Sequence, residues 1–341
     1  MRHTLLAALL VLIPAAPALC ASEKDREKKE KKDEVKMPDN ARKATARALV
    51  WLAKQQNSDG SWSEARYPHN PAITAFATLA FLSQGHVPDQ GDYGKELAKA
   101  QRFLLSCSRD DGYLIGTRGG NMYAHAMAAL ALAELWGVTQ DKKIKPVLQK
   151  AIDLIVSAQA PEGGWRYSPR PSGSDISVTI MQIMALRAAK NAGIHVKDEV
   201  MKKAIGYVKS CWDEHSGGFT YQPRNRSPGF ARTAAGVCVL YLTGEHKSKE
   251  IAPAVKYMKD NFDANQHYWY GHYYASHAMH QVGGKDWKEW YEKVVERFLP
   301  LQKDEGFWSG KDRSSAGPVY DTSIAVLALS VPMNYLPIFQ R

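Results

Sequence analysis

Two acidic residues stand at the starts of apolar segments, where a carboxyl group could donate a proton. Asp175 lies in SDISVT (174–179) and Asp321 in YDTS (320–323). Burial raises the pKa of a carboxyl group, so that it can act as a general acid at neutral pH. The same positions also suit helix capping, because an acid at a helix start accepts hydrogen bonds from free backbone N–H groups. Asp175 and Asp321 are therefore candidate catalytic acids, with capping as the alternative role.

Basic residues gather in the segments that precede the apolar stretches. The candidate ligand contacts among them are Arg118, Arg166, Arg224 and Arg232, and the same segments carry Arg66, Arg170, Arg226, Lys311 and Arg313. Helix N-termini would add free N–H groups and a positive field, so an anionic ligand would be attracted there. Thr179 adds a hydroxyl at one such helix start. The alternative is that these arginines are ordinary solvated loop residues.

A third candidate region is the aromatic and histidine-rich stretch YWYGHYYASHAMH (268–280). Its aromatic faces could hold a carbocation, a polyisoprenoid or a sugar ring, and we take Tyr273, His277 and His280 as candidate ligand contacts. His277 and His280 share a helix face, but a metal site needs a third ligand of known proximity. Packed, hydrogen-bonded histidines are therefore favoured, and the sequence predicts neither a metal site nor another cofactor.

These candidates lie in a sequence that repeats one unit six times. The clearest copies are RALVWLAKQQNSDGSW (47–62), KAQRFLLSCSRDDGYL (99–114), KAIDLIVSAQAPEGGW (150–165) and KVVERFLPLQKDEGFW (293–308), with weaker copies at 203–219 and 253–269. Each predicts an amphipathic helix, a glycine turn and an aromatic residue. A more apolar helix is predicted behind each turn, at 71–84, 121–136, 174–191, 230–242, 271–282 and 319–330.

Two-helix units of this kind bury their apolar faces only by stacking on one another. Six of them, each with an inner and an outer helix, predict an all-α fold, an α6/α6 toroid. In such a ring all inner helices start at the same end. Their N-termini and the preceding loops then form one mouth, where we expect ligand contacts to lie.

The repeat resembles the QW repeat of the terpenoid cyclase and protein prenyltransferase α/α-toroid family, which includes the squalene-hopene cyclases. The copies that carry the resemblance contain Gln56, Gly60 and Trp62; Gln159, Gly163 and Trp165; and Gln302, Gly306 and Trp308. The other copies depart from the motif at the Gln or the Trp position. The resemblance covers about residues 40 to 335 and implies a single toroid whose motif residues are structural.

The resemblance also limits the expected chemistry. Cyclases of the squalene-hopene type protonate an alkene with an Asp-x-Asp-Asp motif, whereas the stretch at 175–178 has one acid. Protein prenyltransferases hold zinc with Asp-x-Cys, which does not occur in this sequence. Catalysis of the terpenoid type therefore stays possible without support from its usual motifs, and whether the protein is an enzyme stays open.

The N-terminal sequence predicts export. A basic start, an apolar run at 5–13 and small residues at 14–21 predict a signal peptide over residues 1–21, and Leu19 before Cys20 argues against a lipid anchor. Residues 22–40 predict a disordered spacer, because residues 23–36 hold seven basic and six acidic side chains. The toroid domain should span 41–335, followed by a tail at 336–341. We expect a periplasmic or extracellular protein without a transmembrane segment.

Several functions fit these observations. The first is a toroid that binds a small hydrophobic or anionic ligand, such as an isoprenoid, in its central cavity, with terpenoid-type catalysis as an extension. A polysaccharide lyase or another carbohydrate-active α/α barrel is an alternative, in which Arg232 would neutralise a uronate and Tyr273 or His277 would remove a proton. A non-catalytic protein-binding scaffold is the third. Nucleic acid is not expected as a partner, because the charged spacer mixes both signs.

Overall fold

Amphipathic and apolar helices alternate along the chain. The computed structural model describes residues 35–340 apart from 117, 118, 226 and 313. The amphipathic helices are α2 (Asp39–Lys54), α4 (Gly94–Ser106), α6 (Ile144–Ser157), α8 (Asp198–Ser210), α10 (Ile251–Asp260) and α12 (Gly284–Phe298). The apolar helices are α3 (Pro71–Leu82), α5 (Met122–Thr139), α7 (Ile176–Asn191), α9 (Phe230–Leu242), α11 (Tyr268–Val282) and α13 (Pro318–Ser330). The six predicted hairpins are confirmed.

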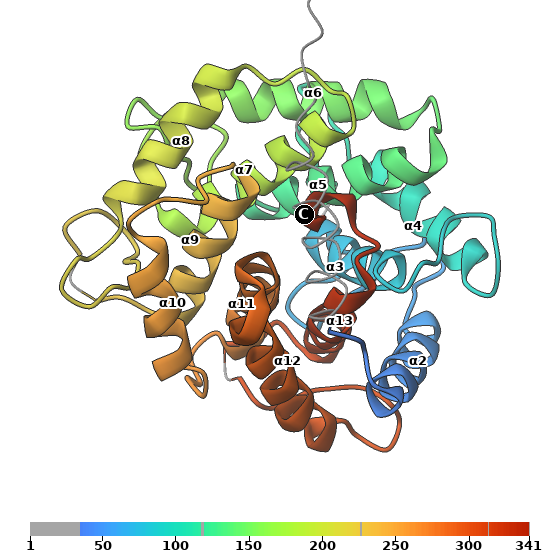
Figure 1. Ribbon diagram of the computed structural model, residues 1–341. Helices are drawn as coiled ribbons and strands as arrows, with labels where there is room; N and C mark the ends of the chain where they lie inside the picture. The colour runs from blue at the N-terminus through green and yellow to red at the C-terminus, as the bar shows by residue number, and fades with distance from the viewer. Residues whose placement is uncertain (1–34, 117–118, 226, 313, 341) are drawn as a thin grey trace, which may run out of the picture. The chain divides into compact units, whose positions relative to one another are not determined.

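The apolar helices form a closed inner ring. Each contacts the next one along the chain, and α13 packs against α3, which closes the circle. The amphipathic helices surround this ring, as Figure 1 shows. Every residue of α3 is buried, whereas α2 buries six of its sixteen residues. A helix enclosed on all sides needs apolar residues around its whole circumference, which explains why the inner helices lack a polar stripe.

The glycine turns join neighbouring hairpins. Gly163 has a φ of +101°, and a Cβ there would lie 2.3 Å from the carbonyl oxygen of Lys203 in the next hairpin. The Gln159 amide donates to the carbonyls of Gly163 (2.8 Å) and Val200 (2.9 Å). Gln302 makes the equivalent bonds to Gly306 and Ala44, and so links the last hairpin to the first. Only glycine fits such a turn, because it combines positive φ with a close backbone contact.

A polar residue early in the inner helix secures the backbone of each well-formed turn. The buried Trp165 N–H donates to Thr179 Oγ1 at 3.0 Å. The same bond occurs with Thr74, Thr233 and Thr322, and the second hairpin uses His125 Nδ1. Thr179 was expected to contact a ligand. In the structure its side chain is instead fully buried beneath the turn.

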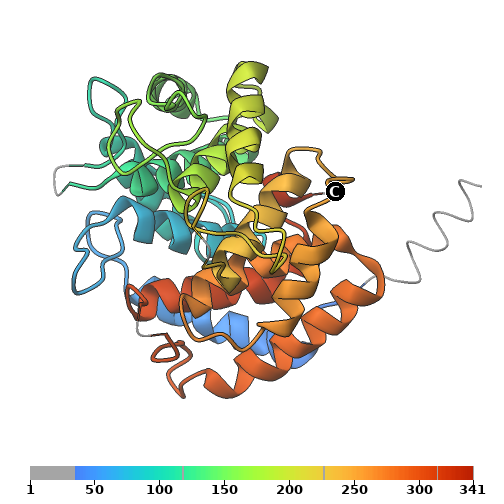
Figure 2. The same ribbon diagram turned by 90° about the vertical axis from the view of Figure 1, so that its left-hand side faces the viewer.

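The two ends of the folded unit differ from the expected boundaries. Met37 is buried and α2 already begins at Asp39, inside the segment expected to be spacer. At the other end, Leu336, Ile338 and Phe339 are buried, and the 3₁₀ helix η3 (Pro337–Phe339) contacts α5 and α7. Residues 336–340 of the expected tail thus form a packed strap over the end of the ring opposite the hairpin loops (Figure 2). The expected signal peptide lies outside the described residues.

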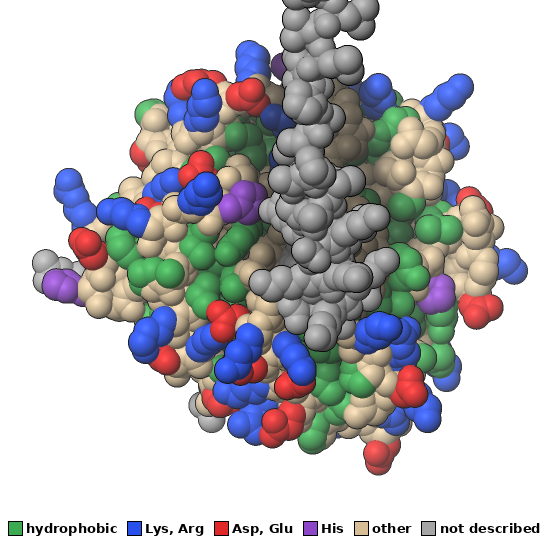
Figure 3. All heavy atoms as spheres, viewed as in Figure 1, with side chains coloured by type: hydrophobic (Ala, Val, Ile, Leu, Met, Phe, Trp, Pro, Cys, Tyr) green, Lys and Arg blue, Asp and Glu red, His purple; other side chains and the backbone are tan. Residues whose placement is uncertain are grey.

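Charges of both signs surround the strap end of the molecule. Figure 3 shows Lys and Arg side chains interspersed with Asp and Glu over this face. Within the part of the chain that the structure describes, every helix is too short or too polar to cross a bilayer.

Candidate ligand site at the mouth of the ring

A cavity of about 690 Å³ lies where the inner helices begin. This volume falls within the range of small-molecule sites in proteins, roughly 300–1,000 Å³. Its aromatic lining consists of Tyr67, Phe76, Tyr123, Tyr167, Tyr221, Tyr270 and Tyr320. Its polar lining consists of Arg66, Asn70, Asn121, Ser177, Arg232, His267, Asp312 and Ser314. The mouth, which the repeat pattern indicated as the place for ligand contacts, is thus an open and aromatic hollow.

Most of the tyrosines in the lining were not among the site residues predicted from the sequence. Tyr123, Tyr270 and Tyr320 lie in the first turns of α5, α11 and α13, and the other lining tyrosines lie in loops that precede inner helices. A signal was present, because Tyr167 and Tyr221 each stand two residues after the aromatic residue of their turn. The candidates predicted from the sequence were helix-start acids, loop arginines and the aromatic stretch 268–280, which contains Tyr270 but none of the other lining tyrosines.

Tyrosine hydroxyls gather at the floor of the cavity. Burial, and then the closeness of one another's hydroxyls, raises the pKa of Tyr123 and of Tyr320 well above the usual value. The ring of Phe76 meets the ring of Tyr320 edge-on, with 5.1 Å between centroids. The floor is therefore uncharged at neutral pH but able to donate and accept hydrogen bonds.

Arg232 is the best-placed cation in the cavity. It stands in the first turn of α9, and its Nη2 donates to the carbonyl of Ser227 at 2.9 Å. Its Nε has no hydrogen-bond partner among the described residues, and no carboxylate of these residues pairs with it. Burial lowers the pKa of Arg232, although Tyr257 and Tyr221 oppose this shift. A half-buried guanidinium without a counter-charge is a favourable site for an anion.

The other expected arginines are not part of this cavity. Arg166 and Arg224 do not line it, and Arg224 is exposed. Arg118 lies outside the described residues. Arg66 does line the cavity, and its Nη2 approaches the carbonyl of Ser315 at 3.5 Å. The expected basic mouth thus contains two described arginines in its lining, Arg66 on the loop before α3 and Arg232 in the first turn of α9.

Asp175 is the N-cap of α7. Its Oδ1 accepts a hydrogen bond from the Val178 N–H at 3.0 Å. Burial raises the pKa of Asp175, while the bonds from Val178 and Tyr221 and the charge of Arg166 oppose this shift. Asp175 is fully buried and does not line the cavity. This geometry is that of a helix cap. A catalytic acid would have to reach a substrate in the cavity, and Asp175 does not line the cavity.

Asp321 lies in a buried group of carboxyls between the last and first hairpins. Burial is the main cause that raises its pKa to about 8; the hydroxyl of Ser315 opposes this, and nearby Asp312 and Glu64 add to it. Glu64 accepts the Tyr320 N–H at 3.0 Å and so caps α13 from another hairpin. Asp321 is therefore protonated at neutral pH, as a general acid must be. Of this group, only Asp312 lines the cavity.

The aromatic and histidine-rich stretch runs from the mouth, where Tyr270 lines the cavity, to the opposite end of the ring, where His277 and His280 lie beside the strap. The ring of His277 stacks on Phe339 of the strap, with centroids 3.5 Å apart and planes at 8°. Tyr273 packs against Phe76 and His277 and is fully buried. Tyr273, His277 and His280 do not line the mouth cavity. Burial lowers the pKa of His277 well below its ordinary value, so this ring is neutral and belongs to the core.

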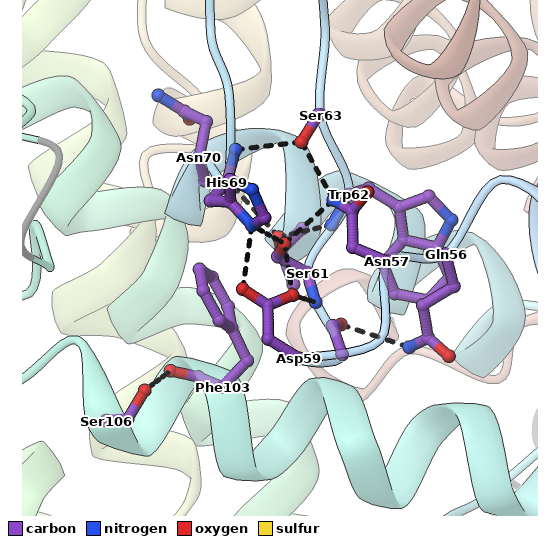
Figure 4. Close-up of polar contacts among 12 residues, drawn as sticks. Gln56, Asn57, Asp59, Ser61, Trp62, Ser63, His69, Asn70, Phe103 and Ser106 are labelled. Carbon is purple, nitrogen blue, oxygen red and sulfur yellow. Dashed lines mark hydrogen bonds and ion pairs between the residues drawn. The ribbon is translucent and has the colours of Figure 1, made fainter.

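A polar network fastens the loop that forms one wall of the cavity. Figure 4 shows Asp59 and His69 pointing toward each other, with Ser61 beside them. Asp59 Oδ2 lies 2.7 Å from His69 Nδ1, and Ser61 Oγ donates to Asp59 Oδ1 at 2.7 Å. Ser61 Oγ also contacts Nδ1 of His69, at 3.0 Å. A catalytic triad uses both ring nitrogens of its histidine, so this arrangement is structural. It holds the loop that carries Arg66 and Tyr67.

The described residues between 35 and 340 form no site that could hold a metal ion. No three side chains of His, Cys, Asp or Glu gather there closely enough to hold an ion. Cys107, Cys211 and Cys238 are free and buried, and burial raises the pKa of Cys107 to about 12. These thiols are therefore protonated core residues rather than nucleophiles or ligands.

Solved structures with the same fold include two kinds of enzyme. An α-1,6-mannanase from a Salegentibacter species superposes with a TM-score of 0.66 at 10% identity, over 87% of this chain and all of that chain. A variant of the type II terpene cyclase MstE from Scytonema, bound to geranylgeranyl dihydroxybenzoate, superposes with a TM-score of 0.63 at 13% identity, over 87% and 99% of the two chains. Identities this low show a common fold and leave the ligand open.

Sequence relatives lie among the squalene-hopene cyclases. The enzyme of Alicyclobacillus acidocaldarius is 29% identical over 118 residues, which is 35% of this chain and 17% of the relative. A probable squalene-hopene cyclase of Sinorhizobium fredii is 23% identical over 220 residues, which is 55% of this chain and 32% of the relative. This chain thus matches a third or less of each relative's length. The sequence model of the prenyltransferase alpha-alpha toroid domain matches residues 33–172 and 170–267, and the chain belongs to this family.

Proposed function

We propose that this protein binds an organic anion with an extended ring or apolar face in the cavity at the mouth of the toroid. The observation that carries the proposal is Arg232, a half-buried guanidinium beside an aromatic wall and without a carboxylate partner among the described residues. A ligand carboxylate or phosphate would supply the missing counter-charge. The tyrosine and phenylalanine rings would contact the remainder of the ligand.

Binding without turnover is the simplest form of this proposal. Asp175 is engaged as a helix cap, and Asp321 is engaged with Ser315. The cavity lining itself has one carboxyl group, that of Asp312. General acid catalysis would need a carboxyl group within reach of the ligand, and glycoside hydrolysis would need two on opposite sides of it. In accordance with the predicted signal peptide, we propose that the protein acts after export.

Both ligand classes considered from the sequence are compatible with such a site. An isoprenoid with an anionic head would place its chain on the aromatic rings, as the family relationship favours. A carbohydrate would use the tyrosines for both stacking and hydrogen bonds. The lyase form of the carbohydrate proposal loses its proposed bases, since Tyr273 and His277 lie away from the cavity that Arg232 lines.

Calorimetric titration would test the role of Arg232. The probes are geranylgeranyl diphosphate, trigalacturonate and the uncharged hydrocarbon squalene. Arg232→Gln should weaken the binding of an anionic probe at least about tenfold, since a charge-assisted hydrogen bond contributes roughly 1.5–3 kcal/mol. Arg224→Gln is the matched control, because Arg224 is an exposed mouth residue outside the cavity lining.

The outcomes separate the possibilities clearly. Weaker binding in Arg232→Gln, with Arg224→Gln unchanged, would support the proposal. Equal losses in both variants would mean that only the general positive field attracts the probes. Failure of every anionic probe to bind at millimolar concentration would overturn the proposal and favour the protein-binding scaffold instead.

A further inference from the structure

The basic and aromatic residues of the cavity occur as two groups on different sides of the mouth. The first group, here called the Arg66 station, consists of Arg66 and Tyr67 on the loop before α3. The second, the Arg232 station, consists of Arg232, Tyr167 and Tyr221. Helices α3 and α9 are three steps apart in a closed ring of six inner helices, so these stations face each other across the cavity.

Each station presents an open aromatic ring. Tyr67 is 44% exposed and Tyr167 is 45% exposed, the highest values among the tyrosines of the lining. The hydroxyl of Tyr167 lies 3.2 Å from that of Tyr221, which fixes the orientation of this pair. A flat, exposed tyrosine offers an apolar face for stacking and a hydroxyl for hydrogen bonds. Each station thus combines one ring-binding surface with one cation.

Neither cation is neutralised by the described part of the chain. No carboxylate oxygen of these residues lies within ion-pair distance of Arg66 or Arg232. Two uncompensated arginines on opposite sides of one cavity match a ligand that carries more than one negative charge. A lipid with a single anionic head would satisfy one station and leave the other without a partner.

The floor of the cavity distinguishes a sugar from an alkyl chain. Tyr123, Tyr270 and Tyr320 bring their hydroxyls together there. The Tyr270 hydroxyl is itself buried, but an alkyl chain lying on this floor would displace water from the hydroxyls of Tyr123 and Tyr320 and return no hydrogen bond. Sugar hydroxyls could replace the water, because each can both donate and accept. The cavity is therefore better matched to a hydroxylated ligand than to an isoprenoid chain.

We infer that the ligand is an acidic oligosaccharide, whose successive sugar rings and carboxylates occupy the Arg66 station and the Arg232 station together. This inference rests on the proposed function, because it names the ligand of the same cavity. A repeating ligand explains why the site repeats an arginine with a tyrosine. It also explains why the tyrosines remain open to solvent rather than packed into the core.

Length and charge of the probe provide the test. Calorimetry would compare mono-, di-, tri- and tetragalacturonate, the fully methyl-esterified trimer, an oligomannuronate trimer and geranylgeranyl diphosphate. We expect at least one acidic trimer to bind about tenfold or more tightly than its monomer, and esterification to abolish this gain. Arg66→Gln and Arg232→Gln should each reduce trimer affinity about tenfold, whereas Arg224→Gln should leave it unchanged.

Variants of the rings test stacking separately from charge. Tyr67→Ala and Tyr167→Ala should weaken the trimer, and Tyr67→Phe and Tyr167→Phe should retain most of the affinity, because the phenyl ring is kept. Circular dichroism and the melting temperature would confirm that each variant is folded. Both positions are exposed, so loss of the fold is not expected.

Two results would overturn the inference in different ways. Tight binding of geranylgeranyl diphosphate that depends on Arg232 but not on Arg66, without binding of either acidic trimer, would reject the oligosaccharide and leave the proposed function standing. Absence of any Arg232-dependent binding by all probes would reject both. Equal affinity for the acidic and the esterified trimer would also reject the acidic oligosaccharide, since the arginines would then have no role in recognition.

Discussion

Replacement of Thr179 by valine tests the structural reading of the inner-helix starts. Thr179 Oγ1 accepts the backbone N–H of Trp165 at 3.0 Å, and both residues are fully buried. Valine has nearly the shape of threonine but lacks the acceptor. Thr179→Val would therefore leave the Trp165 N–H without a partner, in a place that water does not reach.

The expected cost follows from this geometry. A buried donor left without a partner costs about 1–3 kcal/mol. Each kcal/mol lowers the melting temperature of a domain of 150–250 residues by roughly 2–4 °C, so a decrease of about 2–12 °C is expected. Thr78→Val is the matched control. The Thr78 hydroxyl is also buried, but it only donates to the carbonyl of Thr74 within the same helix, so its loss should be nearly neutral.

Differential scanning fluorimetry of both variants would measure this difference. Thr233→Val, which removes the equivalent acceptor for the Phe219 N–H at 2.9 Å, should behave like Thr179→Val. If Thr179→Val melts at the same temperature as Thr78→Val, the turn does not depend on this hydrogen bond and the reasoning is wrong. A folded Thr179→Val should also bind the ligand of the mouth cavity as the wild type does, because Thr179 does not line that cavity.

Further predictions concern the turns, the buried acid and the strap. Gly163→Ala should prevent stable folding, because its Cβ would lie 2.3 Å from a backbone oxygen. Gly193 also has a positive φ, +79°, but no atom lies near its Cβ position, so Gly193→Ala should lower the free energy of unfolding by only about 1–2 kcal/mol. Urea unfolding would measure both variants. Folded Asp321 keeps its proton to a pKa of about 8, whereas the unfolded residue loses it near 3.8, so stability should fall as pH rises between these values. Asp321→Asn should become more stable relative to wild type from pH 5 to pH 8, and a constant difference in melting temperature would contradict this. Phe339→Ala should lower the free energy of unfolding by about 3–5 kcal/mol, because Phe339 is buried in the strap, whereas Tyr335→Ala should change it little, because Tyr335 is exposed. Similar melting temperatures of the two variants would mean that the strap does not stabilise the ring.

The repeat architecture could be predicted because its signals are local. The fourth inner helix was expected at 230–242 and lies at Phe230–Leu242, and the first was expected at 71–84 and lies at Pro71–Leu82. Apolar periodicity and glycine turns act over a few residues, so they can be read directly from the chain. The fifth hairpin was the least regular copy, and α11 begins three residues before the expected position, at Tyr268.

The direction of individual side chains could not be predicted in the same way. Asp175 and Thr179 stand at a helix start, as expected, but both side chains turn back to bind the backbone of their own turn or helix. His277 was predicted to contact a ligand, but its ring stacks on Phe339, which lies more than sixty residues away in the sequence. A pattern of spacing gives the face of a helix, not the distant partner that covers that face.

The sequence by itself determined the helices, their pairing into hairpins and the number of repeats, since each depends on residues that are neighbours in the chain. Only the tertiary structure decided which of those residues face the mouth. Tyr67, Tyr167 and Tyr320 belong to different hairpins, and they line one cavity because the contact of α13 with α3 closes the ring. That closure joins residues separated by most of the chain, and no local pattern records where their side chains meet.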